Sequence, residues 1–134
     1  MKKKILVIDD EVDVLKSLKS GLENKDKDYE VLGLESGKEC IEYLDNCDNL
    51  PDLILIDIMM PEMDGWQVLN RIKENNNLSS IPIVFLTAKT DDFTKKFGST
   101  QTEDFIEKPF DLDDLKSRID DIIKKSKSDY ASLY

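Results

Sequence analysis

The sequence predicts an α/β domain in which helices cover both faces of a five-stranded parallel sheet. Short apolar runs rich in Ile, Val and Leu alternate five times with stretches whose apolar residues recur at helical spacing. Strands joined through helices run parallel, and a parallel sheet needs cover on both faces. A chain of 134 residues is long enough to bury a self-sufficient core. We therefore expect one doubly wound domain.

The expected strands are continuous apolar runs, the pattern typical of strands buried on both faces. Polar or turn-forming residues bound each run. In chain order, the five runs are Ile5–Ile8, Tyr29–Leu34, Leu53–Ile56, Ile83–Leu86 and Phe105–Ile106.

Four other stretches carry apolar residues on one helical face. Asp64-Gly65 is expected to open the third helix, and Asp111 to cap the last. Between Thr90 and Asp104 the pattern is least regular, because Gly98-Ser99-Thr100 interrupts it. The apolar positions of the four helices are Leu15, Leu18 and Leu22; Cys40, Ile41, Leu44 and Cys47; Trp66, Leu69 and Ile72; and Leu112, Leu115, Ile119, Ile122 and Ile123.

The charge balance limits the chemistry and the partners. The chain has 29 Asp and Glu against 19 Lys and Arg, a formal charge of −10, so neither nucleic acid nor an anionic membrane is an expected partner. It contains no histidine, which excludes histidine acid–base catalysis, histidine metal ligands and a role as histidine phosphodonor. Any chemistry of this chain would therefore use carboxylates, hydroxyls and lysines.

The sequence favours a cytoplasmic location. The apolar run that follows the first lysines spans only Ile5–Ile8, too short for a signal-peptide core. Cys40 and Cys47 fall in one expected helix, where two turns place their Cα atoms about 10 Å apart, too far for a disulfide. Reduced cysteines are typical of the cytosol.

Polar side chains follow four of the five expected strands. Asp9-Asp10 end the first, Asp57 the third, Thr87 the fourth and Lys108 the fifth. Because ligands bind beyond the carboxyl ends of strands in open α/β sheets, we expect these side chains to meet at one edge. Taken singly, each has an ordinary role: Asp9-Asp10 as a helix cap, Asp57 as a turn residue, Lys108 as a surface lysine.

Three converging carboxylates need a compensating cation. Oxygen ligands and an incomplete protein shell favour Mg²⁺, with Mn²⁺ as the alternative. A divalent cation, Lys108 and Thr87 around Asp57 would together stabilise phosphoryl oxygens. Asp57 could then attack as a nucleophile and form an acyl phosphate. With no histidine in the chain, the phosphoryl donor would be external.

Four segments resemble the receiver domain of two-component response regulators, related to the chemotaxis response regulator. Each alone is unspecific, whereas all four in order on the expected strand ends are highly specific. The resemblance implies the strand order 2-1-3-4-5, a receiver domain over residues 1–125, and a tail or linker start over 126–134. The segments are Lys4–Glu11 (KILVIDDE), Asp52–Gly65 (DLILIDIMMPEMDG), Ile83–Lys89 (IVFLTAK) and Lys108–Phe110 (KPF).

The same resemblance implies the phosphorylation site and its metal ligands. Asp57 would accept the phosphoryl group from a partner's phosphohistidine. Asp10 would ligate Mg²⁺ directly and Asp9 largely through water. Asp57 and the backbone carbonyl of Met59 would complete the protein ligands.

The resemblance also implies a switch and the partners that use it. Lys108 would pair with one phosphoryl oxygen and Thr87 would bond another, while Phe105 turns inward in response. Pro109 would follow a cis peptide bond. The partners would be a sensor histidine kinase or histidine phosphotransfer protein and a downstream protein effector, and the chain would turn over no separate substrate.

The sequence departs from the receiver pattern before the last strand. Gln101–Asp104 stands where the family usually has a Gly-Ala pair, and the interval from Thr87 to Lys108 is about one residue short, so we expect an irregular segment over Thr90–Asp104. The charged residues of the last helix are expected to form an ordinary solvated surface; they are Lys116, Arg118, Asp120 and Asp121.

Three alternatives remain open from the residues. A flavodoxin-like cofactor binder shares the fold class, but Asp9-Asp10-Glu11 would repel a phosphate placed after the first strand. A haloacid-dehalogenase-type phosphatase needs two aspartates spaced two apart, whereas residues 9 and 11 are Asp and Glu. A degenerate receiver that binds partners without phosphorylation is the third.

Overall fold

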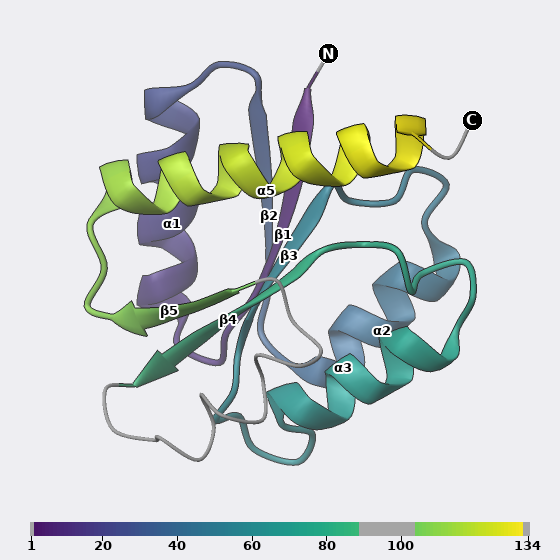
Figure 1. The fold of residues 1–134 in the computed structure, drawn as a ribbon. Coiled ribbons are helices and arrows are strands. Elements are labelled where there is room, and N and C mark those ends of the chain that lie inside the picture. The colour runs from purple at the N-terminus through teal and green to yellow at the C-terminus, as the bar shows by residue number, and fades with distance from the viewer. Residues whose placement is uncertain (1, 89–103, 133–134) are drawn as a thin grey trace.

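The computed structural model describes residues 2–88 and 104–132, with side chains described for residues 2–86 and 105–127. Nine elements follow one another within these ranges (Figure 1). They are β1 (Lys3–Ile8), α1 (Val12–Lys25), β2 (Tyr29–Leu34), α2 (Gly37–Asn46), β3 (Leu53–Asp57), α3 (Gly65–Glu74), β4 (Ile83–Ala88), β5 (Asp104–Lys108) and α5 (Leu112–Ser132).

The strands form one parallel sheet in the order β2-β1-β3-β4-β5, which confirms the predicted fold class and strand order. Ile5 of β1 lies opposite Val31 of β2 on one side and Leu53 of β3 on the other. The chain thus runs outward from β1 to β2 and then returns past β1 to β3. The carboxyl ends of β1 and β3 therefore lie at the point of reversal, which is where open α/β sheets bind ligands.

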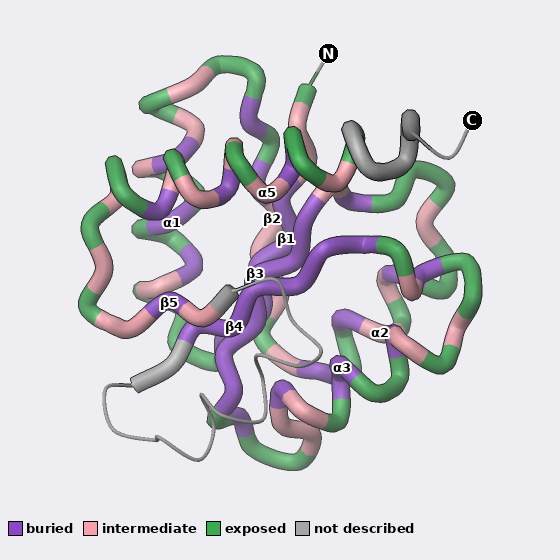
Figure 2. Tube along the Cα trace, viewed as in Figure 1, coloured by how far each residue is buried: buried purple, intermediate pink, exposed green. Residues whose placement is uncertain are grey.

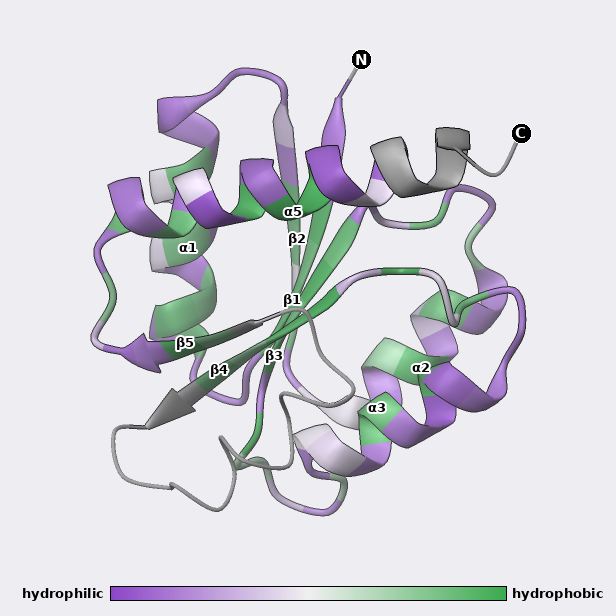
Figure 3. Cartoon of the chain, viewed as in Figure 1, coloured by the Kyte–Doolittle hydropathy of each residue, from purple (hydrophilic) through white to green (hydrophobic). Residues whose placement is uncertain are grey.

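Alternate residues of the central strands supply two separate cores. Ile5 and Val7 pack with α1 and α5 on one face, whereas Leu6 and Ile8 pack with α2 and α3 on the other. Figure 2 shows the buried residues concentrated in the central strands β1, β3 and β4, and Figure 3 shows much of the same strands as hydrophobic. Burial on both faces explains why these strands are continuous apolar runs rather than alternating ones.

Side-chain caps fix the start of three helices. The Ser36 hydroxyl accepts a hydrogen bond from the Glu39 N–H at the start of α2. Asp64 and Gln67 form a reciprocal capping box at the start of α3. Asp111 accepts from the Asp113 N–H before α5. The predicted caps at Asp64 and Asp111 are confirmed, and each satisfies helix N–H groups that have no partner within the helix.

Element ends differ from the expectation in several places. Cys47 lies one residue beyond α2 in an extended conformation, so the placement of both cysteines inside one helix was wrong; both are free. β5 extends the expected pair of residues to Asp104–Lys108, because pairing with β4 recruits charged residues into the sheet. α5 continues to Ser132, past residue 125. The segment expected to be irregular lies, as far as residue 103, outside the described residues.

Within the described ranges, no helix combines the length and the apolar character needed to cross a membrane.

Candidate functional site

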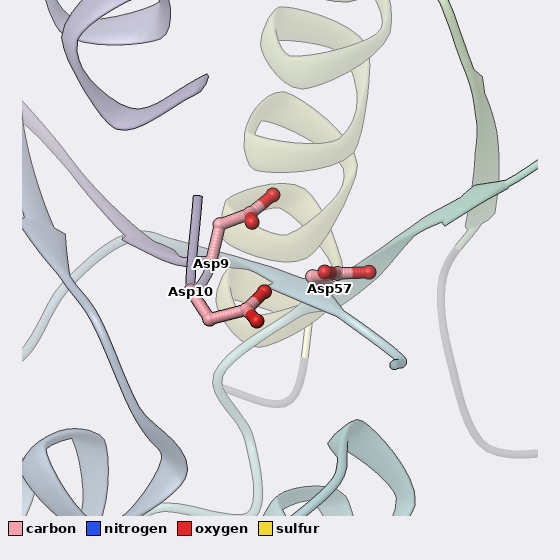
Figure 4. Close-up of side chains that lie close together, drawn as sticks. All are labelled: Asp9, Asp10 and Asp57. Atoms are coloured by element: carbon pink, nitrogen blue, oxygen red, sulfur yellow. The ribbon is translucent and has the colours of Figure 1, made fainter. Parts of the chain in front are cut away.

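Three carboxylates meet where β1 and β3 end. Asp9 and Asp10 follow Ile8, the last residue of β1, and Asp57 is the last residue of β3. One carboxylate oxygen from each lies within 4.8 Å of the others (Figure 4). Asp9 is fully buried and Asp57 is 6% exposed, whereas Asp10 is exposed. The expected convergence of these aspartates is therefore present, with two of them inside the protein and one at the surface.

Lys108 brings a positive charge to this cluster from the end of β5. Its ammonium Nζ lies 2.8 Å from Asp9 Oδ2 and 3.7 Å from Asp57 Oδ2. The stronger contact is thus with Asp9, the more deeply buried of the two carboxylates. The Lys108–Pro109 peptide bond that follows is cis.

The site raises the pKa of Asp57 to about 6. Burial is the largest cause, because removing a carboxylate from water disfavours its charged form, and the negative charge of Asp9 adds to it. Lys108 and the N–H of Met59 oppose the shift, and the charge of Asp10 adds a smaller increase. Folding therefore makes Asp57 harder to ionise, but most of it is still ionised at neutral pH.

The pKa of the Lys108 ammonium is also raised, which for this group favours the charged form. Burial by itself lowers the pKa of this lysine, but the hydrogen bond to Asp9 and the charges of Asp57 and Asp9 outweigh burial and hold the pKa above its ordinary value. Lys108 is consequently a permanent cation at neutral pH, and it leaves three carboxylates facing a single ammonium. The remaining negative charge is what a divalent cation would neutralise.

Backbone groups hold the carboxylates in place. Asp9 Oδ1 accepts the Glu11 N–H at 2.9 Å, which forms a turn between β1 and α1. Asp57 Oδ1 accepts the Met59 N–H at 3.3 Å, and the Gly65 N–H donates to the Ile58 carbonyl at 2.9 Å. The Asp9 side chain thus forms a turn before α1, but the helix begins at its N-cap Glu11 without a side-chain cap hydrogen bond, so the helix-cap expectation for Asp9-Asp10 is wrong. Both residues instead belong to the carboxylate cluster.

The oxygen-only donor set fits a hard divalent cation. Three carboxylates within reach of one another are the ligands that Mg²⁺ and Mn²⁺ prefer. The exposure of Asp10 leaves the cluster open to solvent on one side, which suits an ion that keeps several waters. Within the described residues, this is the one group of at least three acidic or metal-binding side chains close enough to share an ion.

The remaining predicted residues lie on β4 and β5. Thr87 pairs through its backbone with Glu107 and follows Leu86, the residue that pairs with Asp57, but the side chain of Thr87 lies outside the described ones. Phe105 is half-buried, with its ring centroid 5.6 Å from that of Phe85. Phe85 in turn meets Trp66 edge to face at 4.9 Å. These rings connect β5 with the start of α3, a contact that the linear sequence does not reveal.

The expectation of a solvated surface on α5 is wrong for Lys116 and Asp120. Asp120 bonds Lys3 of β1 at 3.1 Å, Lys116 at 2.8 Å and the buried Tyr29 hydroxyl. Lys116 also lies 3.5 Å from Asp26. The spacing of four residues indicates the Lys116–Asp120 pair, but only the packing of α5 over β1 and β2 brings the other partners to it.

Gly65 touches the strand end that carries Asp57. A Cβ at this position would lie 2.9 Å from the Asp57 carbonyl oxygen and 2.9 Å from the Ile58 Cα, both backbone atoms that cannot yield locally. We therefore expect Gly65→Ala to lower the free energy of unfolding by about 2 kcal/mol, measured by urea denaturation, because the strand end must shift.

Gly21→Ala is the matched control. The nearest atoms to a Cβ there belong to the flexible Leu112 side chain, and alanine suits a helix interior better than glycine. We expect this variant to unfold within about 1 kcal/mol of the parent. Equal losses in the two variants would contradict a special contact between Gly65 and the end of β3.

Comparison with known proteins places this chain in a family. The family described as "Response regulator receiver domain" matches residues 5–120. The transcriptional regulatory protein PhoP for alkaline phosphatase synthesis in Bacillus subtilis is 33% identical over 127 residues, which are 94% of this chain and 50% of that protein. The transcriptional regulatory protein CrdR of Helicobacter pylori is 38% identical over 120 residues, 89% of this chain and 54% of that protein.

Solved structures show the same similarity. A response regulator receiver domain protein from Clostridium thermocellum is 30% identical, with a TM-score of 0.80 over 93% of this chain and 97% of that one. The phosphorylated cyanobacterial phytochrome response regulator RcpA is 27% identical, with a TM-score of 0.77 over 91% of both chains. The chain spans about half the length of the curated relatives PhoP and CrdR.

Proposed function

The chain belongs to the response regulator receiver family, and from this premise we propose that Asp57 accepts a phosphoryl group from a phosphohistidine of a partner protein. One observation carries the proposal. Asp57 ends β3 within reach of two other carboxylates and lies 3.7 Å from the Lys108 ammonium. The excess of negative charge in this cluster can bind a cation, and the Asp57 carboxylate can then act as the nucleophile that accepts a phosphoryl group.

The proposed transfer is a direct displacement at phosphorus. An Asp57 carboxylate oxygen attacks, the P–N bond to the partner's imidazole breaks, and the leaving nitrogen keeps the electron pair and takes a proton from solvent. Attack requires the ionised carboxylate. With its pKa raised to about 6, most of Asp57 is ionised at neutral pH, and a neighbouring cation favours that form further.

In this proposal the acidic cluster holds Mg²⁺, or Mn²⁺ in its place. Asp9, Asp10 and Asp57 would supply carboxylate oxygens, and Met59 its backbone carbonyl. The cation, when bound, neutralises charge on the transferred group. The Lys108 ammonium would leave its position between Asp9 and Asp57 to bond one phosphoryl oxygen, and Thr87 would bond another. Phe105, which packs against Phe85, would then turn inward in response to phosphorylation.

The partners follow from the two-component context. We propose a sensor histidine kinase or histidine phosphotransfer protein as the donor and a protein effector as the recipient of the signal, in the cytoplasm. Relatives of this chain are named as transcriptional regulators, a probable cyclic di-GMP phosphodiesterase and a sensor histidine kinase. Proteins with different outputs thus share similarity with this chain. We propose that the chain itself turns over no separate substrate.

We also propose that residues 1–125 form the receiver domain and 126–134 the start of a tail or linker. The family match over residues 5–120 supports this division. Because α5 continues to Ser132, the proposed linker begins as a helical extension rather than as an irregular segment.

The test is phosphorylation by a small phosphodonor. Incubation with an acyl phosphate or phosphoramidate and Mg²⁺ is expected to add one phosphoryl group per chain, measured by intact-protein mass spectrometry. Asp57→Asn should abolish the addition, because an amide cannot attack and form an acyl phosphate. Omitting the divalent cation should greatly slow the reaction of the parent protein.

Asp45→Asn is the control for this experiment, since it removes an exposed carboxylate of the same kind from α2. It should be labelled as the parent is. Stoichiometric labelling of Asp57→Asn would refute the assignment of the acceptor. Absence of labelling in the parent with either donor would refute the proposed function.

A further inference from the structure

Among the strands that the structure describes, β2 lies at one edge of the sheet and has β1 as its only neighbour. The carbonyls of Asp28 and Leu34 accept hydrogen bonds from the N–H groups of Lys3 and Asp9, at either end of β1. Residues of even number in β2 therefore point their backbone groups toward β1, and Tyr29, Val31 and Gly33 point theirs outward. An edge of this kind is where another strand can add.

Two side chains of α1 occupy the outward groups of Val31, the middle residue of this edge. Glu23 Oε2 accepts the Val31 N–H at 2.9 Å, and Lys19 Nζ donates to the Val31 carbonyl at 2.9 Å. The two side chains bond each other at 3.1 Å, so the three residues close a ring. Next to it, the Tyr29 N–H is already bonded to the Asp26 carbonyl.

The ring reproduces what a neighbouring strand would supply. An added strand presents one carbonyl and one N–H to each outward-facing residue of its neighbour. At Val31 the carboxylate takes the place of that carbonyl and the ammonium takes the place of that N–H. An ordinary helical pair four residues apart bonds only to itself and to water, and contributes little. Here both members also bond a single backbone residue of another element.

We propose that Lys19 and Glu23 act as a substitute for a neighbouring strand and thereby close the β2 edge to a second copy of this chain. A second copy is the relevant partner because it presents the same edge, and two identical edges can pair about a twofold axis and continue the sheet. The ring lies on the edge strand away from the aspartate cluster, so this inference does not depend on the proposed function.

The first test is the exchange of the Val31 amide hydrogen, measured by NMR in dilute protein. In Lys19→Ala/Glu23→Ala this amide should exchange about tenfold faster than in the parent, because its acceptor is gone. Glu23→Gln keeps an acceptor oxygen and Lys19→Arg keeps a donor, so each should retain most of the protection. Unchanged exchange in the double alanine variant would overturn the inference.

The second test is self-association, measured by sedimentation velocity over a concentration series. The double alanine variant should shift toward dimer at concentrations where the parent does not. Its Val31 amide should regain protection as the dimer forms, because the second copy then supplies the acceptor. Association without that renewed protection would mean that another surface is responsible, and would overturn the proposal.

Lys38→Ala/Glu42→Ala is the matched control. It removes the same two residue types at the same spacing from exposed positions on α2, and so changes the net charge identically. It should neither speed the exchange of the Val31 amide nor shift the protein toward dimer. Equal self-association of the control and the test variant would overturn a specific role for Lys19 and Glu23.

Discussion

Replacing Lys108 with methionine is expected to lower the free energy of unfolding of the metal-free protein by about 3–5 kcal/mol. Asp9 is fully buried, and its Oδ2 atom is bonded to the Lys108 ammonium at 2.8 Å. Methionine keeps most of the length of the side chain but removes the charge. The variant would leave the buried Asp9 carboxylate without a compensating cation. An uncompensated buried charge is the main reason why removing one partner of a buried ion pair destabilises a protein.

Urea denaturation with and without Mg²⁺ separates this effect from a loss of packing. A divalent cation in the cluster would compensate the same carboxylates, so we expect saturating Mg²⁺ to recover a large part of the lost stability. Lys16→Met, an exposed lysine of α1, is the control and should change little. A deficit that Mg²⁺ leaves unchanged would show that Lys108 matters through its packing and not its charge.

Asp57→Asn is expected to have the opposite effect and to stabilise the metal-free protein at about pH 7.5 by about 3 kcal/mol. The folded protein raises the pKa of Asp57 from an ordinary 3.8 to about 6, chiefly through burial and the charge of Asp9. Ionised Asp57 is therefore disfavoured in the folded state relative to the unfolded one. Asparagine fills nearly the same space without the charge.

The pH dependence has a defined sign. Below about pH 3 both states hold the Asp57 proton, and ionisation of this residue does not affect the stability of the folded protein. As the pH rises from about 3 to 6, the unfolded state loses the proton first, so the stability of the parent falls and stays lower above about pH 6. The stabilisation by Asp57→Asn should consequently grow across this range and be nearly absent at about pH 3.

Thermal or urea unfolding of both proteins at several pH values in a chelating buffer would measure this difference. Asp45→Asn makes the same change of net charge at an exposed position and should produce no comparable pH-dependent gain. Added Mg²⁺ should stabilise the parent and have much less effect on Asp57→Asn, which lacks one of the proposed ligands. If Asp57→Asn were less stable than the parent at neutral pH, the inference that the ionised, buried Asp57 carboxylate destabilises the folded protein would be contradicted.

Much of the fold could be predicted from the sequence because parallel strands buried on both faces leave an unambiguous pattern. The runs that became β1, β3 and β4 are apolar throughout, so their existence and order follow from hydrophobicity alone. Element ends were less predictable. Lys3 and Lys108 belong to strands because their backbones pair with neighbouring strands, an interaction that side-chain hydropathy does not express.

The site could be predicted only in part. The order of strands and the position of Asp9, Asp10 and Asp57 at their carboxyl ends are enough to bring the three carboxylates together. Sequence reasoning did not distinguish the buried Asp9 from the adjacent exposed Asp10. It also did not indicate which carboxylate Lys108 contacts most closely, and in this structure that carboxylate is Asp9. The contact of Lys108 with a phosphoryl group stays a prediction.

The sequence by itself determined the fold class, the strand order through its resemblance to receivers, and the residues that meet at the carboxyl edge of the sheet. At that edge three carboxylates, Asp9, Asp10 and Asp57, concentrate negative charge. The chain has no histidine, and under the proposed function the phosphoryl donor would be a partner protein. Only the tertiary structure decided which carboxylate Lys108 holds, that Asp120 binds Lys3 and Tyr29, and that Lys19 and Glu23 close the ring on Val31. The reason is that hydropathy and spacing are properties of the chain along its length, whereas burial and ion pairing depend on which residues from distant elements share a few ångströms of space.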